Sequence, residues 1–79
     1  MTRDELRAEI ADILGVDAEA VTEETGKENT PEWDSMAALQ IISLLDQEVD
    51  GEIEAEQAEK LTSFAAVTEL AREHGVLSD

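Results

Sequence analysis

An aspartate carboxylate and a serine hydroxyl stand side by side at Asp34-Ser35, where the most apolar stretch of the chain begins. Pro31 and Asn29 keep the approach to this pair non-helical, so a helix is expected to begin here and to run to about Val49. Either Asp34 or Ser35 has a side-chain oxygen that can accept a hydrogen bond from a free backbone N–H of the first turn. The pair therefore predicts at least a helix cap.

Catalysis by Ser35 itself is not expected. A serine hydroxyl is a weak nucleophile unless a base lies next to it. The only histidine, His74, is expected at the end of the last helix, where the helix dipole is a sufficient structural reason for it. The chain has 21 acidic residues among 79, so most carboxylates are expected to be solvated surface groups. The sequence therefore predicts a protein that is not an enzyme.

The chain is short, acidic and free of cysteine. Its 79 residues make one domain, 1–79, with 5 basic and 21 acidic residues and a net charge of −16. Nucleic acid and anionic membrane surfaces would repel it. It has no cysteine for a disulfide or a zinc site, and no apolar run approaches the ~18 residues of a membrane span. We expect a soluble, cytoplasmic monomer that binds no nucleic acid and inserts into no membrane.

Helical periodicity accounts for the apolar residues, and no alternating β pattern is present. A capping-box pair at Thr2 and Glu5 predicts a first helix from Arg3 to Leu14, which Gly15 can end. Further helices are expected from the Asp34-Ser35 pair onward, over 57–61, and over 64–74 after a Thr62-Ser63 cap. The expected fold is an all-α bundle of three major helices and one short helix, with a long first connection over 16–33.

The helix after Ser35 differs from the others because apolar residues occupy most of its circumference. Such a helix is expected to be central and packed against several neighbours. Its apolar residues are Ala38, Leu39, Ile41, Ile42, Leu44, Leu45 and Val49, and the narrow face that remains carries Met36, Gln40, Ser43 and Gln47. Trp33, just before the pair, is expected to be a loop aromatic that closes over the core.

The segment from Asp34 to Ile53, followed by Ala58-Glu59-Lys60-Leu61-Thr62-Ser63-Phe64, resembles acyl and peptidyl carrier proteins, in which the serine of an Asp-Ser-Leu/Met motif carries phosphopantetheine. The resemblance covers essentially the whole chain. It implies that a phosphopantetheinyl transferase attaches the cofactor to Ser35, with Asp34 positioning the serine or contacting the transferase. It also implies partners: an enzyme that loads an acyl or aminoacyl group as a thioester, and a transferase or synthase that receives it.

The face of the helix that follows the serine departs from the fatty-acid branch of this family. Those carriers usually have acidic residues directly after the serine, whereas Met36, Gln40, Ser43 and Gln47 are uncharged here and acidic charge resumes at Asp46. The Asp-Ser-Met start with Gln40 is closer to D-alanyl carriers, and the segment 58–70 is closer to fatty-acid carriers. We expect these four residues and Asp46 to contact partners, and the role to lie in a specialised biosynthetic pathway rather than primary fatty-acid synthesis.

An alternative interpretation starts from the acidic segment Asp46–Gln57, whose spacing resembles an EF-hand loop with Gly51 at the sharp turn. Its twelfth position is Gln57, which lacks the bidentate carboxylate of a calcium loop, and no second loop is present to pair with it. On this interpretation the chain is an unmodified acidic helical module that binds calcium or a basic partner.

Overall fold

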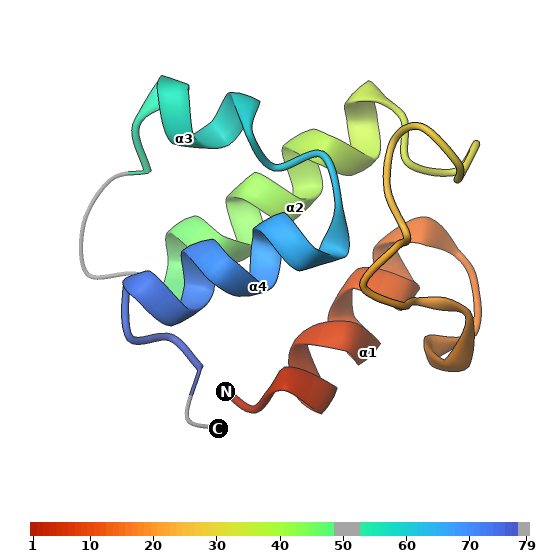
Figure 1. The fold of residues 1–79 in the computed structure, drawn as a ribbon, viewed down its shortest axis with the longest axis horizontal. Helices are drawn as coiled ribbons and strands as arrows, with labels where there is room; N and C mark the ends of the chain where they lie inside the picture. The colour runs from red at the N-terminus through yellow and green to blue at the C-terminus, as the bar shows by residue number, and fades with distance from the viewer. Residues whose placement is uncertain (49–52, 78–79) are drawn as a thin grey trace.

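The computed structural model describes residues 1–48 and 53–77. These residues form α1 (Arg3–Leu14), a short 3₁₀ helix η1 (Ala18–Ala20), α2 (Ser35–Glu48), α3 (Ala55–Glu59) and α4 (Phe64–Glu73). Figure 1 shows α2 and α4 running across the molecule, with α1 below them and α3 above. The fold is a small all-α bundle, as predicted, and the described residues contain no strand.

Local signals in the sequence define α1 at both ends. The Glu5 backbone N–H donates to the Thr2 hydroxyl over 3.1 Å, and the Thr2 backbone N–H donates to the Glu5 carboxylate over 3.0 Å. Gly15 ends the helix at φ 72°, a left-handed conformation that a side chain would strain. The predicted bounds and the predicted capping box of this helix are confirmed.

The expectation that α2 is a central helix packed against several neighbours does not hold on the side of Leu39. Ala37, Ile41 and Leu45 are buried at intervals of four residues, and two further apolar side chains of α2 are partly buried against the same core. Leu39 is 67% exposed. The five residues of α3 are too few to cover the opposite face of a 14-residue helix, so α2 remains amphipathic. Val49, the last residue predicted for this helix, lies outside the described residues.

The two C-terminal helices lie close to their predicted positions. Helix α3 begins two residues earlier than predicted and ends at Glu59, so Leu61 is buried beyond the end of the helix. The Ser63 hydroxyl caps α4 by accepting a hydrogen bond from the Ala66 N–H over 3.1 Å, as predicted. Helix α4 ends at Glu73, one residue earlier than predicted, and His74 is its C-cap residue.

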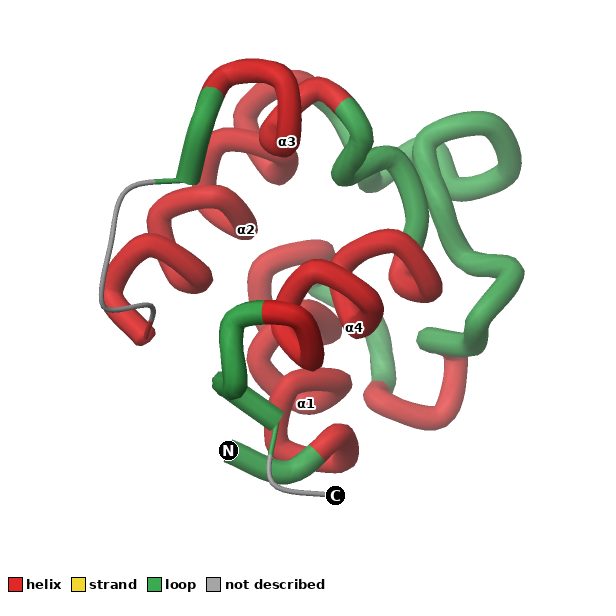
Figure 2. The backbone as a smooth tube through the Cα atoms, turned by 60° about the vertical axis from the view of Figure 1, so that its left-hand side comes forward, coloured by secondary structure: helices red, strands yellow, loops and turns green. Residues whose placement is uncertain are grey.

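The long connection between α1 and α2 is ordered by its own polar side chains. The buried Thr25 hydroxyl donates to the Ala20 carbonyl over 3.1 Å. The Asn29 side chain accepts from the Gly26 N–H over 2.9 Å and donates to the Glu24 carbonyl. Figure 2 shows the connection following one side of the bundle. These hydrogen bonds give fixed positions to a segment that contains only one short 3₁₀ helix.

Backbone hydrogen bonds join this connection to the segment between α3 and α4. The Lys27 N–H donates to the Thr62 carbonyl, and the Phe64 N–H donates to the Thr25 carbonyl, each over 2.8 Å. Gly26 and Ser63 form an isolated antiparallel bridge between the two segments. The approach to α2 and the approach to α4 are therefore held together as one unit.

A single core holds the helices together. Helix α1 packs against η1, α2 and α4. The Met1 ammonium group donates to the Val76 carbonyl over 3.1 Å, so the two ends of the described chain meet. The largest fully buried side chains of the core are Leu6, Ile10, Val21, Ile41, Leu45, Phe64 and Val67.

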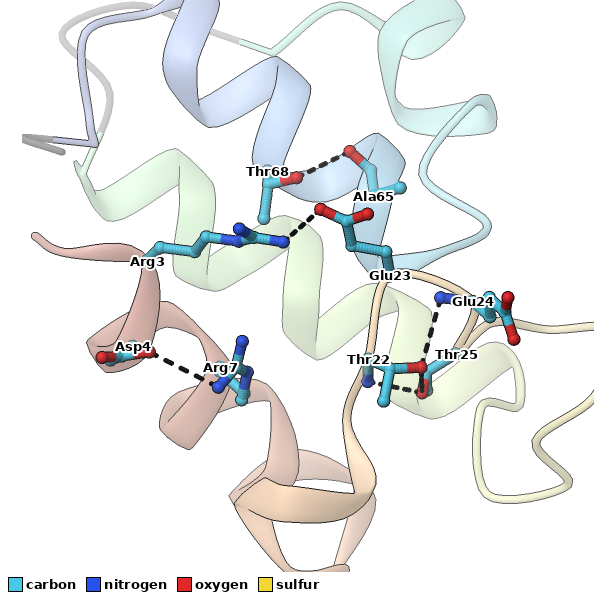
Figure 3. Close-up of polar contacts among 9 residues, drawn as sticks. All are labelled: Arg3, Asp4, Arg7, Thr22, Glu23, Glu24, Thr25, Ala65 and Thr68. Carbon is cyan, nitrogen blue, oxygen red and sulfur yellow. Dashed lines mark hydrogen bonds and ion pairs between the residues drawn. The ribbon is translucent and has the colours of Figure 1, made fainter.

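Two of the five basic residues lie on α1 and form ion pairs there (Figure 3). Arg3 pairs with Glu23 of the long connection, and Arg7 pairs with Asp4 over 3.4 Å. The Arg7 guanidinium also lies 5.9 Å from the centre of the Phe64 ring, a distance typical of a cation–π contact. Five basic residues can pair with at most five of the 21 acidic ones, so the net charge of −16 remains whatever the pairing.

Because this charge is mostly at the surface, we expect the melting temperature to rise between low and moderate ionic strength. Salt shortens the range of the repulsion between like charges to about 10 Å at 0.1 M, so this repulsion destabilises the folded state less. Millimolar magnesium should stabilise nearly as well as calcium. Thermal unfolding followed by circular dichroism measures both effects. A salt-insensitive midpoint would contradict this prediction, and a sharp preference for calcium would support the EF-hand-like alternative.

Candidate functional site

Ser35 is the first residue of α2 and is exposed to solvent. Of the two residues that could cap the helix, Asp34 is the one that does so. Its carboxylate oxygen Oδ1 accepts a hydrogen bond from the Ala37 N–H over 2.9 Å, and its carbonyl accepts one from the Ala38 N–H over 2.9 Å. The Ser35 hydroxyl is therefore not used to cap the helix.

The start of α2 also leaves backbone donors available. The Asp34 side chain accepts from the N–H of Ala37. The backbone N–H groups of Ser35 and Met36 come before it in the first turn, where no carbonyl of the helix lies four residues earlier to accept a hydrogen bond. Backbone N–H groups at this position and the positive end of the helix dipole favour a negatively charged group. A phosphate attached to the Ser35 hydroxyl would lie close to these N–H groups and to the positive end of the dipole.

The structure does not bring the only histidine to Ser35. His74 follows α4, and the end of α4 lies across the molecule from the start of α2 (Figure 1). Asp34, the neighbouring carboxylate, is already engaged as the cap. Neither His74 nor Asp34 is therefore placed to activate the Ser35 hydroxyl as a nucleophile.

A cavity of about 430 Å³ lies beside Ser35. This volume falls at the small end of the range of ~300–1,000 Å³ that is usual for ligand pockets. Segments far apart in sequence meet in its wall: the connection before α2, the first turns of α2, α3, and the segment that leads to α4. Its lining includes Lys27, Trp33, Ser35, Leu39, Ala58 and Leu61. Apolar side chains, one basic side chain and two acidic residues, Asp34 and Glu59, therefore line the space next to the hydroxyl.

Trp33 forms part of this wall and also part of the core. Its side chain is buried, with 3% of the residue exposed, which confirms the predicted role of closing over the core. Its backbone N–H donates to the Thr30 carbonyl over 2.9 Å, whereas its indole Nε1–H has no hydrogen-bond partner among the described residues. No pattern in the sequence predicted the cavity, because the cavity depends on contacts between distant segments.

The residues predicted to contact partners are all exposed on α2. They are Met36, Gln40, Ser43, Asp46 and Gln47. Met36, which is 70% exposed, and Gln40 line a hollow on the side of α2 that faces α1. Leu39 was missed as a surface residue, since its apolar character suggested the core, and it lies on the side that faces α3. An apolar side chain therefore stands on each side of the helix next to Ser35.

The acidic segment Asp46–Gln57 is described only in part. Asp46 and Glu48 are exposed, whereas Asp50, Gly51 and Glu52 lie outside the described residues. Among residues 1–48 and 53–77, no group of three or more histidine, cysteine, aspartate or glutamate side chains is arranged to hold a metal ion.

Within the same ranges, none of the helices has the length and apolar character needed to span a bilayer. No known family model matches the sequence.

Proposed function

We propose that the protein is a carrier that holds an acyl or aminoacyl group as a thioester on phosphopantetheine attached to Ser35. The observation that supports this best is the division of labour at the start of α2: Asp34 caps the helix, and the adjacent Ser35 hydroxyl is exposed. A hydroxyl needed for the cap would be poorly available to a modifying enzyme. Here it is available, and free backbone donors lie next to it.

The modification requires no catalytic group from this chain. A phosphopantetheinyl transferase would supply the base that removes the Ser35 proton. The serine oxygen then forms a bond to the phosphorus next to the pantetheine, the diphosphate bond of coenzyme A breaks, and adenosine 3′,5′-bisphosphate leaves. Ser35 is a substrate in this step. The thiol at the end of the arm then gives this cysteine-free chain its reactive sulfur.

Partners would dock around the modified serine. A loading enzyme delivers the acyl or aminoacyl group, and a downstream transferase or synthase removes it. Met36, Gln40 and Leu39 offer such enzymes a weakly polar surface with no charge in the first turns of α2. This surface favours a role in a specialised biosynthetic pathway over primary fatty-acid synthesis, whose enzymes bind acidic residues at these positions in the carriers that this chain resembles.

Intact mass measurement tests the proposal directly. The purified chain is incubated with coenzyme A, magnesium and a broad-specificity phosphopantetheinyl transferase. We expect a single addition of the phosphopantetheine mass, located on Ser35 by peptide fragmentation. A chain that stays unmodified under conditions that convert a known carrier would overturn the proposal and leave the unmodified acidic module as the interpretation.

The identity of the docking surface gives a further prediction. Met36→Lys should slow loading by the cognate enzyme by at least about fivefold, because loss of a central apolar contact at an interface often costs more than ~1 kcal/mol. Glu54→Lys, at the exposed N-cap of α3, should change mainly the association rate and its salt dependence. The measurement is the loading rate of each holo variant at two salt concentrations.

The opposite result would identify a different surface. If Glu54→Lys abolished loading and Met36→Lys had no effect, partners would dock on α3. Leu39→Lys is a matched probe, since Leu39 is as exposed as Met36 but lies on the α3 side of the helix. Efficient elongation of the loaded protein by general fatty-acid enzymes would contradict the specialised role.

A further inference from the structure

Met36 directly follows Ser35 and is 70% exposed, although methionine is among the residue types most often buried. The chain has two methionines and no cysteine, so these two thioethers contain its only sulfur atoms. The other methionine, Met1, is partly buried against the core. The sulfur that is most open to solvent therefore lies in the first turn of α2, beside the candidate site.

A solvent-exposed thioether reacts with hydrogen peroxide. The sulfur lone pair attacks one peroxide oxygen, the O–O bond breaks, and a sulfur–oxygen bond forms while the second oxygen leaves as water. The sulfur is thereby oxidised by two electrons, and the peroxide is reduced. The product, methionine sulfoxide, is polar, and methionine sulfoxide reductases convert it back to methionine with electrons from a thiol reductant.

The rest of the chain offers peroxide few competing groups. Trp33 is the only tryptophan, and it is buried with 3% of the residue exposed. No thiol is present before a cofactor is attached. Because the Met36 side chain lies at the surface, an added oxygen displaces no packed side chain of the core. Oxidation is therefore expected at Met36 first, and the bundle should remain folded.

The surroundings of Met36 determine what its oxidation changes. Met36 lines the hollow of about 290 Å³ on the α1 side of α2. The other exposed residues of this lining, Glu32, Asp34 and Gln40, are all polar. Gln40 lies four residues after Met36 on the same side of the helix, so its side-chain amide can donate to a sulfoxide oxygen. Oxidation thus removes the only exposed apolar side chain of the hollow.

We propose that Met36 is a reversible oxidation site, and that its sulfoxide slows the enzymes that dock beside Ser35. The effect on docking rests on the proposed function, whereas the oxidation itself does not. An enzyme that reaches the Ser35 hydroxyl also approaches the next residue of the helix. When this residue is oxidised, the enzyme loses an adaptable apolar contact and must remove water from a polar oxygen. Peroxide therefore slows the carrier, and reduction of the sulfoxide restores it.

The experiment compares the chain without cofactor before and after treatment with hydrogen peroxide. Peptide fragmentation locates the added oxygen, which we expect on Met36 before Met1. After the peroxide is removed, the initial rate of phosphopantetheine attachment is measured with coenzyme A and the broad-specificity transferase. We expect the oxidised protein to react at least about fivefold more slowly, the effect of losing one central apolar contact. Methionine sulfoxide reductases with a thiol reductant should restore both the mass and the rate.

Two substitutions at the same position separate the sulfur from other causes. Met36→Leu keeps an apolar side chain and removes the sulfur, so peroxide should not change the rate of this variant from its own untreated value. Met36→Gln places a polar side chain there without any oxidation, so it should react as slowly as the oxidised native chain. Both variants are expected to fold, because the position is exposed, and circular dichroism of each sample checks the helix content.

Oxygen found first on Met1 or Trp33 would overturn the inference. An unchanged rate in protein that is fully oxidised at Met36 would also overturn it, as would an equal loss of rate in peroxide-treated Met36→Leu, and both results would leave the proposed function intact. A native chain that the transferase does not modify even before oxidation would instead refute the proposed function, while peptide fragmentation would still show whether Met36 is the oxidation site.

Discussion

Replacing Ser35 by alanine is expected to abolish attachment of phosphopantetheine while the bundle stays folded. The reacting oxygen is lost, and no other serine within residues 1–48 and 53–77 is the first residue of a helix capped by an aspartate. Because Asp34 caps α2 and Ser35 is exposed, the free energy of unfolding should change by less than about 0.5 kcal/mol. Intact mass after incubation with the transferase and a denaturant titration measure the two effects.

Ser43 and Ser63 provide matched controls. Ser43 is exposed within α2, so Ser43→Ala should leave stability unchanged and should keep the label on Ser35. Ser63 caps α4, so Ser63→Ala should lose about 1 kcal/mol of stability and keep full labelling. Labelling that survives in Ser35→Ala, or that maps to either control serine, would refute the carrier proposal.

Local signals in the sequence were enough to predict most of the helix ends. The Thr2–Glu5 capping box and Gly15 define α1, and the Ser63 hydroxyl begins α4, because each depends on residues within one turn of the helix end. The cap at Asp34 was one of two alternatives. Asp34 and Ser35 are adjacent and have similar capping preferences, so only the hydrogen bond to the Ala37 N–H distinguishes them.

The burial of α2 could not be predicted in the same way. Leu39 and Ile41 are both apolar, yet Ile41 is fully buried and Leu39 is 67% exposed. The difference depends on which neighbouring helix reaches each side of α2, and a five-residue α3 covers little. A helix that is apolar around most of its circumference can therefore either be central or leave part of that surface for a partner.

The candidate site was predictable only at its centre. Asp34 and Ser35 are adjacent in sequence, so their placement at a helix start required no tertiary information. The cavity beside them needs Lys27, Trp33 and Leu61 to meet, and they meet because backbone hydrogen bonds join the two approach segments at Thr25, Lys27 and Thr62. Pairings of this kind, between residues more than 30 positions apart, leave no periodic pattern in the sequence.

Gly26 is the tightest point of that junction, and Gly26→Ala is expected to destabilise the protein strongly. A methyl group added at its Cα would lie 2.5 Å from the Thr62 carbonyl oxygen and 3.0 Å from Ser63. The obstacle is backbone, so it cannot rotate away. The two segments would have to separate, which weakens the hydrogen bonds from Lys27 to Thr62 and from Phe64 to Thr25. We expect a loss of at least ~2 kcal/mol, which lowers the melting temperature of a domain this size by roughly 10 °C or more.

Gly15→Ala separates crowding from the general cost of replacing a glycine. Gly15 adopts φ +72° and has open space around it, so alanine there should cost only about 1–2 kcal/mol of backbone strain. Thermal unfolding of both variants gives the comparison. Gly26→Ala should also disturb the wall of the cavity, which Lys27 and Thr62 help to form, and so shift the single tryptophan's emission toward that of an exposed indole. If Gly26→Ala is no less stable than Gly15→Ala and its emission is unchanged, then the two segments do not hold the cavity in place.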